Sequence, residues 1–179
     1  MCAGEKLRIN LNSDELKIAD NYLKECQLKS NLHHPNIAQF MGLVFLLDHP
    51  LPLLVIEQLE ESLDDLLKTV PHIPLILKRS ILEDVARGLQ YLHEYKPQII
   101  HGDLTAKNVL LTSSLAAKIN DFGSAHIMSL KPDHLSMYMP PEASIEASDY
   151  GSSFDIFSFG HLTLVTLTQV WLSCIVLCV

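Results

Sequence analysis

Three side chains with oxygen donors, Asp103, Asn108 and Asp121, follow one another in the stretch between His101 and Gly123. Phosphoryl transfer to a hydroxyl group needs a carboxylate beside the nucleophile and oxygen ligands for Mg²⁺. The stretch offers groups of both kinds, two carboxylates and one amide oxygen. The alternative is that the two aspartates are ordinary turn carboxylates beside glycine and asparagine. The order of the three donors therefore predicts a phosphoryl-transfer site.

The composition limits the classes of protein to which the chain can belong. Its 179 residues are 48% hydrophobic with a mean hydropathy of +0.20, which is enough to bury the core of one domain. The net charge of -8 and the pI near 5.5 argue against a nucleic-acid partner, because phosphate backbones select basic surfaces. We therefore expect a globular domain that binds no nucleic acid.

The cysteines and the first residues indicate the compartment. Cys2, Cys26, Cys174 and Cys178 lack C-x-x-C spacing, which favours a reducing environment over a disulfide framework or a metal site. The chain does not open with a charged segment followed by an apolar one, as a secretory signal would. We expect a cytoplasmic protein.

Several elements must hold these donors in place. Ser13 is a predicted N-cap, followed by a helix with an apolar face, and the apolar runs 37–47 and 51–57 predict two antiparallel strands. Ser62 is predicted to cap a helix over 63–70. A longer amphipathic helix is predicted over 75–95, with Ile81, Leu82, Val85, Leu89 and Leu92 inward and Lys78, Glu83, Asp84 and Arg87 outward. A short strand over 98–100 and a strand-turn-strand between Asn108 and Asp121 complete the expected frame.

The candidate stretch resembles the catalytic loop of eukaryotic protein kinases. His101-Gly102-Asp103-Leu104-Thr105-Ala106-Lys107-Asn108 is similar to H-R-D-L-x-x-x-N, and Asp121-Phe122-Gly123 matches D-F-G. Pro140-Pro141-Glu142 resembles the A-P-E motif. The residues Thr105-Ala106-Lys107-Asn108 and Pro140-Pro141-Glu142 are most similar to those of tyrosine-kinase-like and tyrosine kinases.

The resemblance implies a bilobal α+β fold that is incomplete at both ends. Residues 1–57 would form a partial N-lobe sheet with the family's αC helix, and residues 58–61 the hinge. Residues 62–179 would form a mainly helical, partial C-lobe that ends in the helix called αF. The implied function is transfer of the ATP γ-phosphoryl group to a protein Ser/Thr or Tyr hydroxyl, with ATP and Mg²⁺ as cofactors and a protein substrate or signalling partner.

The resemblance also implies roles for individual residues. Asp103, Lys107 and Asn108 would be catalytic, and Asn108 and Asp121 would hold the metal. Nucleotide contacts would come from Ile56, Glu57, Leu59, Leu110 and Asp121, with Ile56 behind the adenine, Glu57 and Leu59 binding through their backbone, and Leu110 beneath the base. Structural or regulatory roles would fall to Glu25, His101, Phe122, Gly123, Glu142 and Asp155, with Glu25 pairing the strand lysine and Asp155 bracing the catalytic loop.

Four departures from the family pattern support a second reading. Glu5 stands where active kinases place the strand lysine, and Lys29 stands where the family prefers an apolar residue. Gly102 replaces the arginine that receives an activation-loop phosphate, and the segment before Pro140 is short. The alternative function is therefore a catalytically inactive pseudokinase or interaction module.

The run Leu162–Val179 contains no formally charged side chain. Its length and polarity are compatible with a membrane helix. The favoured reading is a helix buried on all sides in the C-lobe, because threonine, serine and glutamine interrupt the run. Membrane attachment through 162–179 stays the less favoured alternative.

Overall fold

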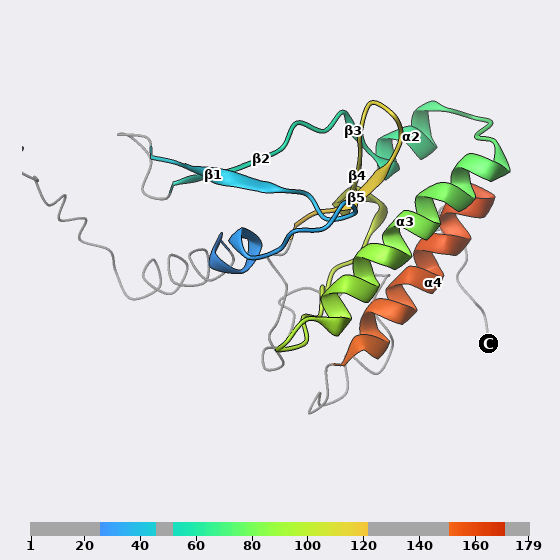
Figure 1. Ribbon diagram of the computed structural model, residues 1–179. Coiled ribbons are helices and arrows are strands. Elements are labelled where there is room, and N and C mark those ends of the chain that lie inside the picture. The colour runs from blue at the N-terminus through green and yellow to red at the C-terminus, as the bar shows by residue number, and fades with distance from the viewer. Residues whose placement is uncertain (1–25, 46–51, 122–150, 171–179) are drawn as a thin grey trace, which may run out of the picture.

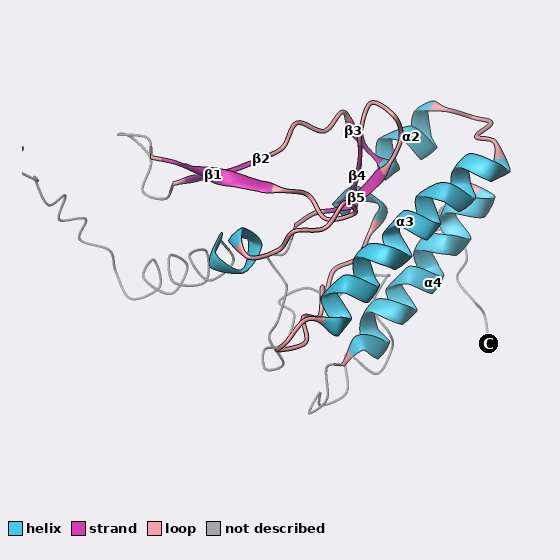
Figure 2. Ribbon diagram, viewed as in Figure 1, coloured by secondary structure: helices cyan, strands magenta, loops and turns pink. Residues whose placement is uncertain are grey.

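The computed structural model describes residues 26–45, 52–121 and 151–170, which form an α+β arrangement (Figure 2). Its strands are β1 (Phe40–Val44), β2 (Leu53–Ile56), β3 (Glu61–Ser62), β4 (Val109–Leu111) and β5 (Ala117–Ile119). Its helices are α2 (Leu63–Thr69), α3 (Leu75–Glu94), the 3-10 turn η1 (Ala106–Asn108) and α4 (Ser152–Thr168), and residues 26–30 are also helical. The predicted α+β class is confirmed.

The described strands form two antiparallel sheets. β1 pairs with β2 from Phe40 opposite Ile56 to Val44 opposite Leu53, and β3, β4 and β5 form the second sheet in that order. In Figure 1 the β1–β2 ribbon extends away from the second sheet and the long helices. Both predicted strand pairs are found. The strand predicted over 98–100 is wrong, because Ile100 makes only an isolated bridge.

The amphipathic helix α3 organises the core. It packs against α4 on one side and β5 on the other (Figure 1). The apolar positions predicted to face inward are all buried, namely Ile81, Leu82, Val85, Leu89 and Leu92. The period of 3.6 residues thus identified the buried stripe of α3 correctly.

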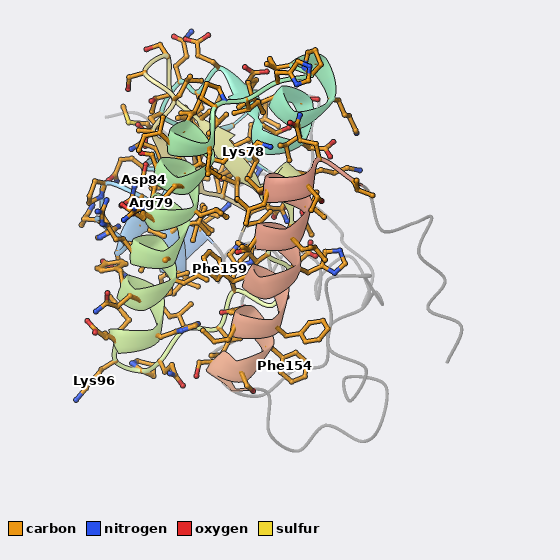
Figure 3. All side chains as sticks on the ribbon, turned by 90° about the vertical axis from the view of Figure 1, so that its right-hand side faces the viewer. Lys78, Arg79, Asp84, Lys96, Phe154 and Phe159 are labelled. Carbon is orange, nitrogen blue, oxygen red and sulfur yellow. The ribbon has the colours of Figure 1, made fainter. Side chains whose placement is uncertain are left out.

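Two polar residues of α3 that were predicted to face solvent do not. Lys78 is 7% exposed, and its Nζ donates to the carbonyl oxygen of Leu167 at 2.9 Å and to Oε1 of Gln169 at 3.0 Å. Figure 3 shows Lys78 between α3 and α4. Asp84 accepts a 3.0 Å bond from the backbone N–H of Ala117. The expectation was wrong because each side chain satisfies backbone groups of another element, which periodicity does not reveal.

The last described helix ends before the apolar run does. α4 closes at Thr168, where Gln169 takes a left-handed conformation with φ 54°. The side-chain amide of Gln169 donates to the carbonyl oxygens of Leu67 at 3.3 Å and Val70 at 2.8 Å. The described part of the run 162–179 is therefore not one continuous helix, and residues 171–179 lie outside the described ranges. Across the ranges 26–45, 52–121 and 151–170, no helix has the length and apolar character needed to span a bilayer.

Burial of α4 on all sides is also not observed. Phe154, Leu162 and Val165 are buried, and Phe159 packs partly buried against the same core (Figure 3). Ile156 and Leu164, by contrast, are 58% and 46% exposed. α4 thus buries one face, while apolar residues on its other faces stay exposed.

Gly88 lies where α3 packs tightly against its neighbours. A Cβ atom there would lie 2.8 Å from the carbonyl oxygen of Asn36 and 2.8 Å from Cδ1 of Ile119. We expect Gly88→Ala to lower the free energy of unfolding by about 1 kcal/mol, because overpacking of about 1–3 kcal/mol exceeds the gain of about 1 kcal/mol in helix propensity. The matched control is Gly160→Ala in α4, where a Cβ would meet nothing within 4 Å. Urea unfolding should show destabilisation at Gly88 and none at Gly160; equal stability of the two variants would contradict the packing argument.

Candidate active site

Asp103 and Asn108 are in direct contact. The η1 turn brings Asn108 back toward Asp103, and its Nδ2 donates to the backbone oxygen of Asp103 at 2.8 Å and to Oδ2 at 3.1 Å. Because the amide nitrogen is engaged by Asp103, Oδ1 is the atom of Asn108 left to coordinate a cation. The contact fixes the Asp103 carboxylate relative to Asn108.

His101 connects this loop to the residue before Asp121. Its ring is fully buried, with Nδ1 accepting from the backbone N–H of Asp103 at 3.2 Å and Nε2 3.0 Å from the carbonyl oxygen of Asn120. Since a carbonyl can only accept, Nε2 carries the proton and the ring is the neutral Nε2–H tautomer. Asn120 also donates its backbone N–H to the carbonyl oxygen of Asn108 at 2.8 Å. The residue before Asp121 is therefore hydrogen-bonded to both His101 and Asn108.

Asp155 fixes the backbone at the start of the loop. This carboxylate of α4 is 0% exposed and accepts three hydrogen bonds. Oδ2 accepts from the backbone N–H of His101 at 2.9 Å and from Nε2 of His93 at 2.8 Å, and Oδ1 accepts from the N–H of Gly102 at 2.9 Å. A buried carboxylate is tolerated when its oxygens are satisfied in this way. The contact couples the loop to α4 and, through His93, to α3.

Two residues of the candidate site, one of them the predicted metal ligand Asp121, adopt left-handed backbone conformations. Gly102 has φ 79° and Asp121 has φ 61°. Glycine adopts this region without the clash that a side chain brings, and aspartate tolerates it better than most residues. The glycine that replaces the expected arginine thus suits the bend between His101 and Asp103.

The residues predicted to contact the nucleotide lie at the junction of the two sheets. Ile56 ends β2 and Glu57 follows it, while Leu59 lies in the connection to β3; all three are half-buried. Leu110 is half-buried in β4 between the buried Val109 and Leu111. The strand therefore turns Leu110 away from the core, toward the face on which a planar base could stack.

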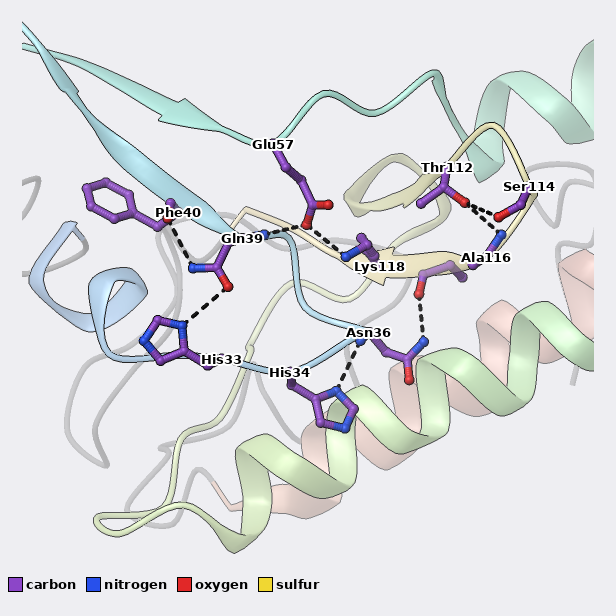
Figure 4. Close-up of polar contacts among 11 residues, drawn as sticks. His33, His34, Asn36, Gln39, Phe40, Glu57, Thr112, Ser114, Ala116 and Lys118 are labelled. Carbon is purple, nitrogen blue, oxygen red and sulfur yellow. Dashed lines mark hydrogen bonds and ion pairs between the residues drawn. The ribbon is translucent and has the colours of Figure 1, made fainter.

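Glu57 forms an ion pair with Lys118 of β5. Oε1 of Glu57 lies 2.8 Å from Nζ of Lys118, and the same oxygen accepts from the backbone N–H of Gln39 at 2.8 Å (Figure 4). Burial acts to raise the pKa of Glu57, but the hydrogen bonds from Lys118 and Gln39 and the charge of Lys118 lower it below its ordinary value. Glu57 is therefore ionised at neutral pH.

Asn108 and Asp121 are the residues of the loop that could hold Mg²⁺. Asn108 contributes an amide oxygen, and Asp121 is exposed at the end of the strand-turn-strand. Within the described ranges no group of three or more His, Cys, Asp or Glu side chains is placed to hold a metal ion. A pair of hard oxygen ligands suits a magnesium ion that takes its other ligands from water and from phosphates.

Lys107 is exposed on η1 beside α2. The nearby Asp65 has a pKa lowered chiefly by the hydrogen bond from the Ser62 hydroxyl, with smaller contributions from the charges of Lys68 and Lys107. Ser62 and Asp65 form the capping box of α2, so the predicted N-cap is confirmed. The positive charge of Lys107 is thus close enough to the first turn of α2 to affect Asp65.

Four predicted site residues, Glu25, Phe122, Gly123 and Glu142, lie outside the described residues, as does Glu5. Their expected roles stay predictions. Lys29, by contrast, is described and is 6% exposed.

Sequence reasoning missed several residues that hold the site together. His93 was not identified as a site residue. Its place beside the apolar Leu92, in the last turn of α3, is the sequence feature that could have indicated a partly buried side chain. Lys118 and Asn36 were also missed. The Asn36 side chain donates to the carbonyl oxygen of Ala117 at 3.0 Å (Figure 4). Its backbone oxygen accepts from the N–H of Ile119 at 2.9 Å. Contacts across such separations leave no local pattern.

Comparison with known proteins gives concordant matches. The family model for the protein kinase domain matches residues 6–174. A probable serine/threonine-protein kinase of Dictyostelium discoideum is 32% identical over 84% of this chain and 15% of its own length. A dual specificity protein kinase of that organism is 30% identical over 83% of this chain and 31% of its own length. A seven transmembrane domain-containing tyrosine-protein kinase, also from Dictyostelium, is 36% identical over 88% of this chain and 24% of its own length. The chain thus spans less than a third of each of these relatives.

Replacing Asp155 by asparagine tests the anchoring of the loop. One amide N–H₂ would then face backbone or histidine donors, so we expect Asp155→Asn to lower the free energy of unfolding by about 2–4 kcal/mol. Glu83→Gln is the control, because Glu83 is 45% exposed in its ion pair with Arg79 and such pairs contribute under about 1 kcal/mol. Chemical denaturation measures both. If Asp155→Asn is as stable as the Glu83→Gln control, the three hydrogen bonds do not anchor the loop.

The ion pair predicts a pH dependence with a definite sign. Because the pKa of Glu57 is lower in the folded state than its ordinary value of 4.5, the carboxylate stabilises the fold above that pH. The stabilisation is lost as pH falls below 4.5 through the folded-state pKa. We therefore expect Lys118→Met to lose less stability than the unmodified chain between about pH 5 and pH 3 in urea titrations. Parallel curves for the two proteins would contradict this assignment.

Proposed function

The chain belongs to the protein kinase family, and on that basis we propose that it transfers the γ-phosphoryl group of ATP to a hydroxyl group of a protein substrate. The observation that carries the proposal is the direct contact of Asp103 with Asn108, joined through His101 and Asn120 to Asp121. One hydrogen-bonded unit thus contains a candidate base and two candidate metal ligands.

The roles follow from the chemistry of each group. Asp103 orients the substrate hydroxyl and receives its proton, because its carboxylate is held by Asn108 on one side. Asn108 and Asp121 hold Mg²⁺, which when bound neutralises charge on the phosphates. Lys107 adds positive charge on the exposed side of the loop, where the transferred group carries negative charge.

The nucleobase is proposed to bind between the sheets. Leu110 forms the floor and Ile56 the back of the site. The backbone N–H of Glu57 already donates to the carbonyl oxygen of Gln39 at 2.9 Å, so the carbonyl of Glu57 is the backbone group left for the base. Leu59 supplies the next backbone contact. In this scheme residues 1–57 form the N-lobe part, 58–61 the hinge and 62–179 the C-lobe part.

We place the domain in the cytoplasm, where ATP and protein substrates are present and cysteines stay reduced. The acceptor residue is proposed only as a protein hydroxyl, of Ser/Thr or of Tyr. The relatives include kinases named for serine/threonine, for tyrosine and for dual specificity.

The second candidate function is a catalytically inactive pseudokinase or interaction module. It is favoured by Glu5 at the position of the strand lysine and by Gly102 in place of the arginine. Loss of the lysine removes a positive charge from the phosphates, on which phosphoryl transfer depends. This module would bind a signalling partner without turnover.

Radiolabel incorporation into a mixed protein substrate separates the two functions. With Mg-ATP we expect incorporation by the unmodified chain, reduced about a hundredfold or more in Asp103→Asn, since that change removes the proton acceptor. Asp121→Asn should reduce incorporation as well, and the loss should be partly recovered at higher Mg²⁺ concentration. Incorporation no higher than in Asp103→Asn would remove the enzyme function and leave the interaction module.

A further inference from the structure

The ion pair between Lys118 and Glu57 joins the two ends of the proposed nucleotide site. Lys118 lies in β5, three residues before the candidate metal ligand Asp121. Glu57 directly follows β2, at the proposed adenine contact. The two residues are 61 positions apart in sequence, so their 2.8 Å contact is created by the fold alone.

The register of the small sheet places Lys118 beside the proposed floor of the site. Leu110 of β4 and Lys118 of β5 are cross-strand partners, so their side chains leave the same face of the sheet. The opposite face, formed by Val109, Leu111, Ala117 and Ile119, is buried in the core. Lys118 therefore rises from the half-exposed face and reaches Glu57 above it, as Figure 4 shows.

Glu57 makes three hydrogen bonds in this arrangement. Its Oε1 accepts from both Lys118 and the backbone N–H of Gln39, and its own backbone N–H donates to the carbonyl oxygen of Gln39. Lys118 and Glu57 have side-chain exposures of 14% and 27%, so the pair is better shielded from water than a typical surface pair. The backbone at residue 57 is thereby fixed relative to β5.

We propose that Lys118 is a positioning residue of the nucleotide site, which fixes the carbonyl of Glu57 for the base while β5 presents Asp121 to the phosphates. The inference rests on the proposed function. A backbone acceptor that is already fixed loses less conformational freedom on binding, and affinity rises accordingly. Lys118 acts here through Glu57 and makes no contact with phosphate.

The test compares Lys118→Met with the unmodified 179-residue chain in calorimetric titrations with Mg-ATP and with adenosine. Methionine keeps most of the length and apolar character of the lysine side chain and removes its charge. We expect both ligands to bind about five- to tenfold more weakly, because the loss lies at the base and not at the phosphates. Glu57→Gln should show the same direction with a smaller change, since the amide oxygen can still accept from Gln39. The two substitutions should combine non-additively in a double-mutant cycle.

The control is Arg79→Met, which removes a positive charge from the exposed ion pair of Arg79 with Glu83 on α3. The two side chains of this pair are 74% and 45% exposed. Arg79→Met should leave both affinities unchanged. Equal binding by Lys118→Met and the unmodified chain would overturn the inference, and so would a loss confined to Mg-ATP, which would make Lys118 a phosphate ligand. If Lys118→Met does not fold, unchanged affinities in Glu57→Gln overturn it. Failure of the unmodified chain to bind either ligand would instead refute the proposed nucleotide site itself.

Discussion

The burial of one carboxylate, Asp155, is the constraint on which the candidate site depends. It lies on α4, a helix whose other buried residues are mostly apolar, so the carboxylate needs polar partners within the protein. Those partners are the N–H groups of residues 101 and 102 and the ring of His93. The N–H groups of the loop need the carboxylate as well, because without it these donors would have no acceptor. From this point His101 continues the connection to Asp103 and Asn120.

Strand β5 links the core with the candidate site. Its buried face contacts α3, and its backbone bonds to residues 36 and 38, with Ala38 donating to the oxygen of Ile119 at 2.8 Å. The other face carries Lys118 toward the end of β2. The two described sheets are thus joined by backbone hydrogen bonds at one end of β5 and by an ion pair on its face. A change in the position of β5 would move the proposed base contacts and Asp121 together.

The features that were predictable from sequence are local ones. The capping box at Ser62, the buried stripe of α3 and the hairpin of β4 and β5 follow from short-range patterns, and the loop motif brought Asp103 and Asn108 to attention. The errors have a common physical origin in contacts between distant elements. Lys78 and Asp84 looked like solvent-facing residues because their partners, Gln169 and the N–H of Ala117, belong to other segments. The same reason hid His93 and Lys118, and it explains why an apolar sequence over 162–179 did not reveal that the described helix ends at Thr168.

The meeting point of Lys78 and Gln169 bears on how the domain tolerates a change of length. Gln169 supplies donors for the last carbonyl groups of α2 and an acceptor for Lys78, so one amide serves three helices at once. A chain shortened to residue 168 would leave the Lys78 ammonium group and the carbonyls of Leu67 and Val70 without that amide, although every residue of the catalytic loop would still be present. Hydrogen bonds from one residue beyond the last turn of α4 thus contribute to the packing of α2, α3 and α4.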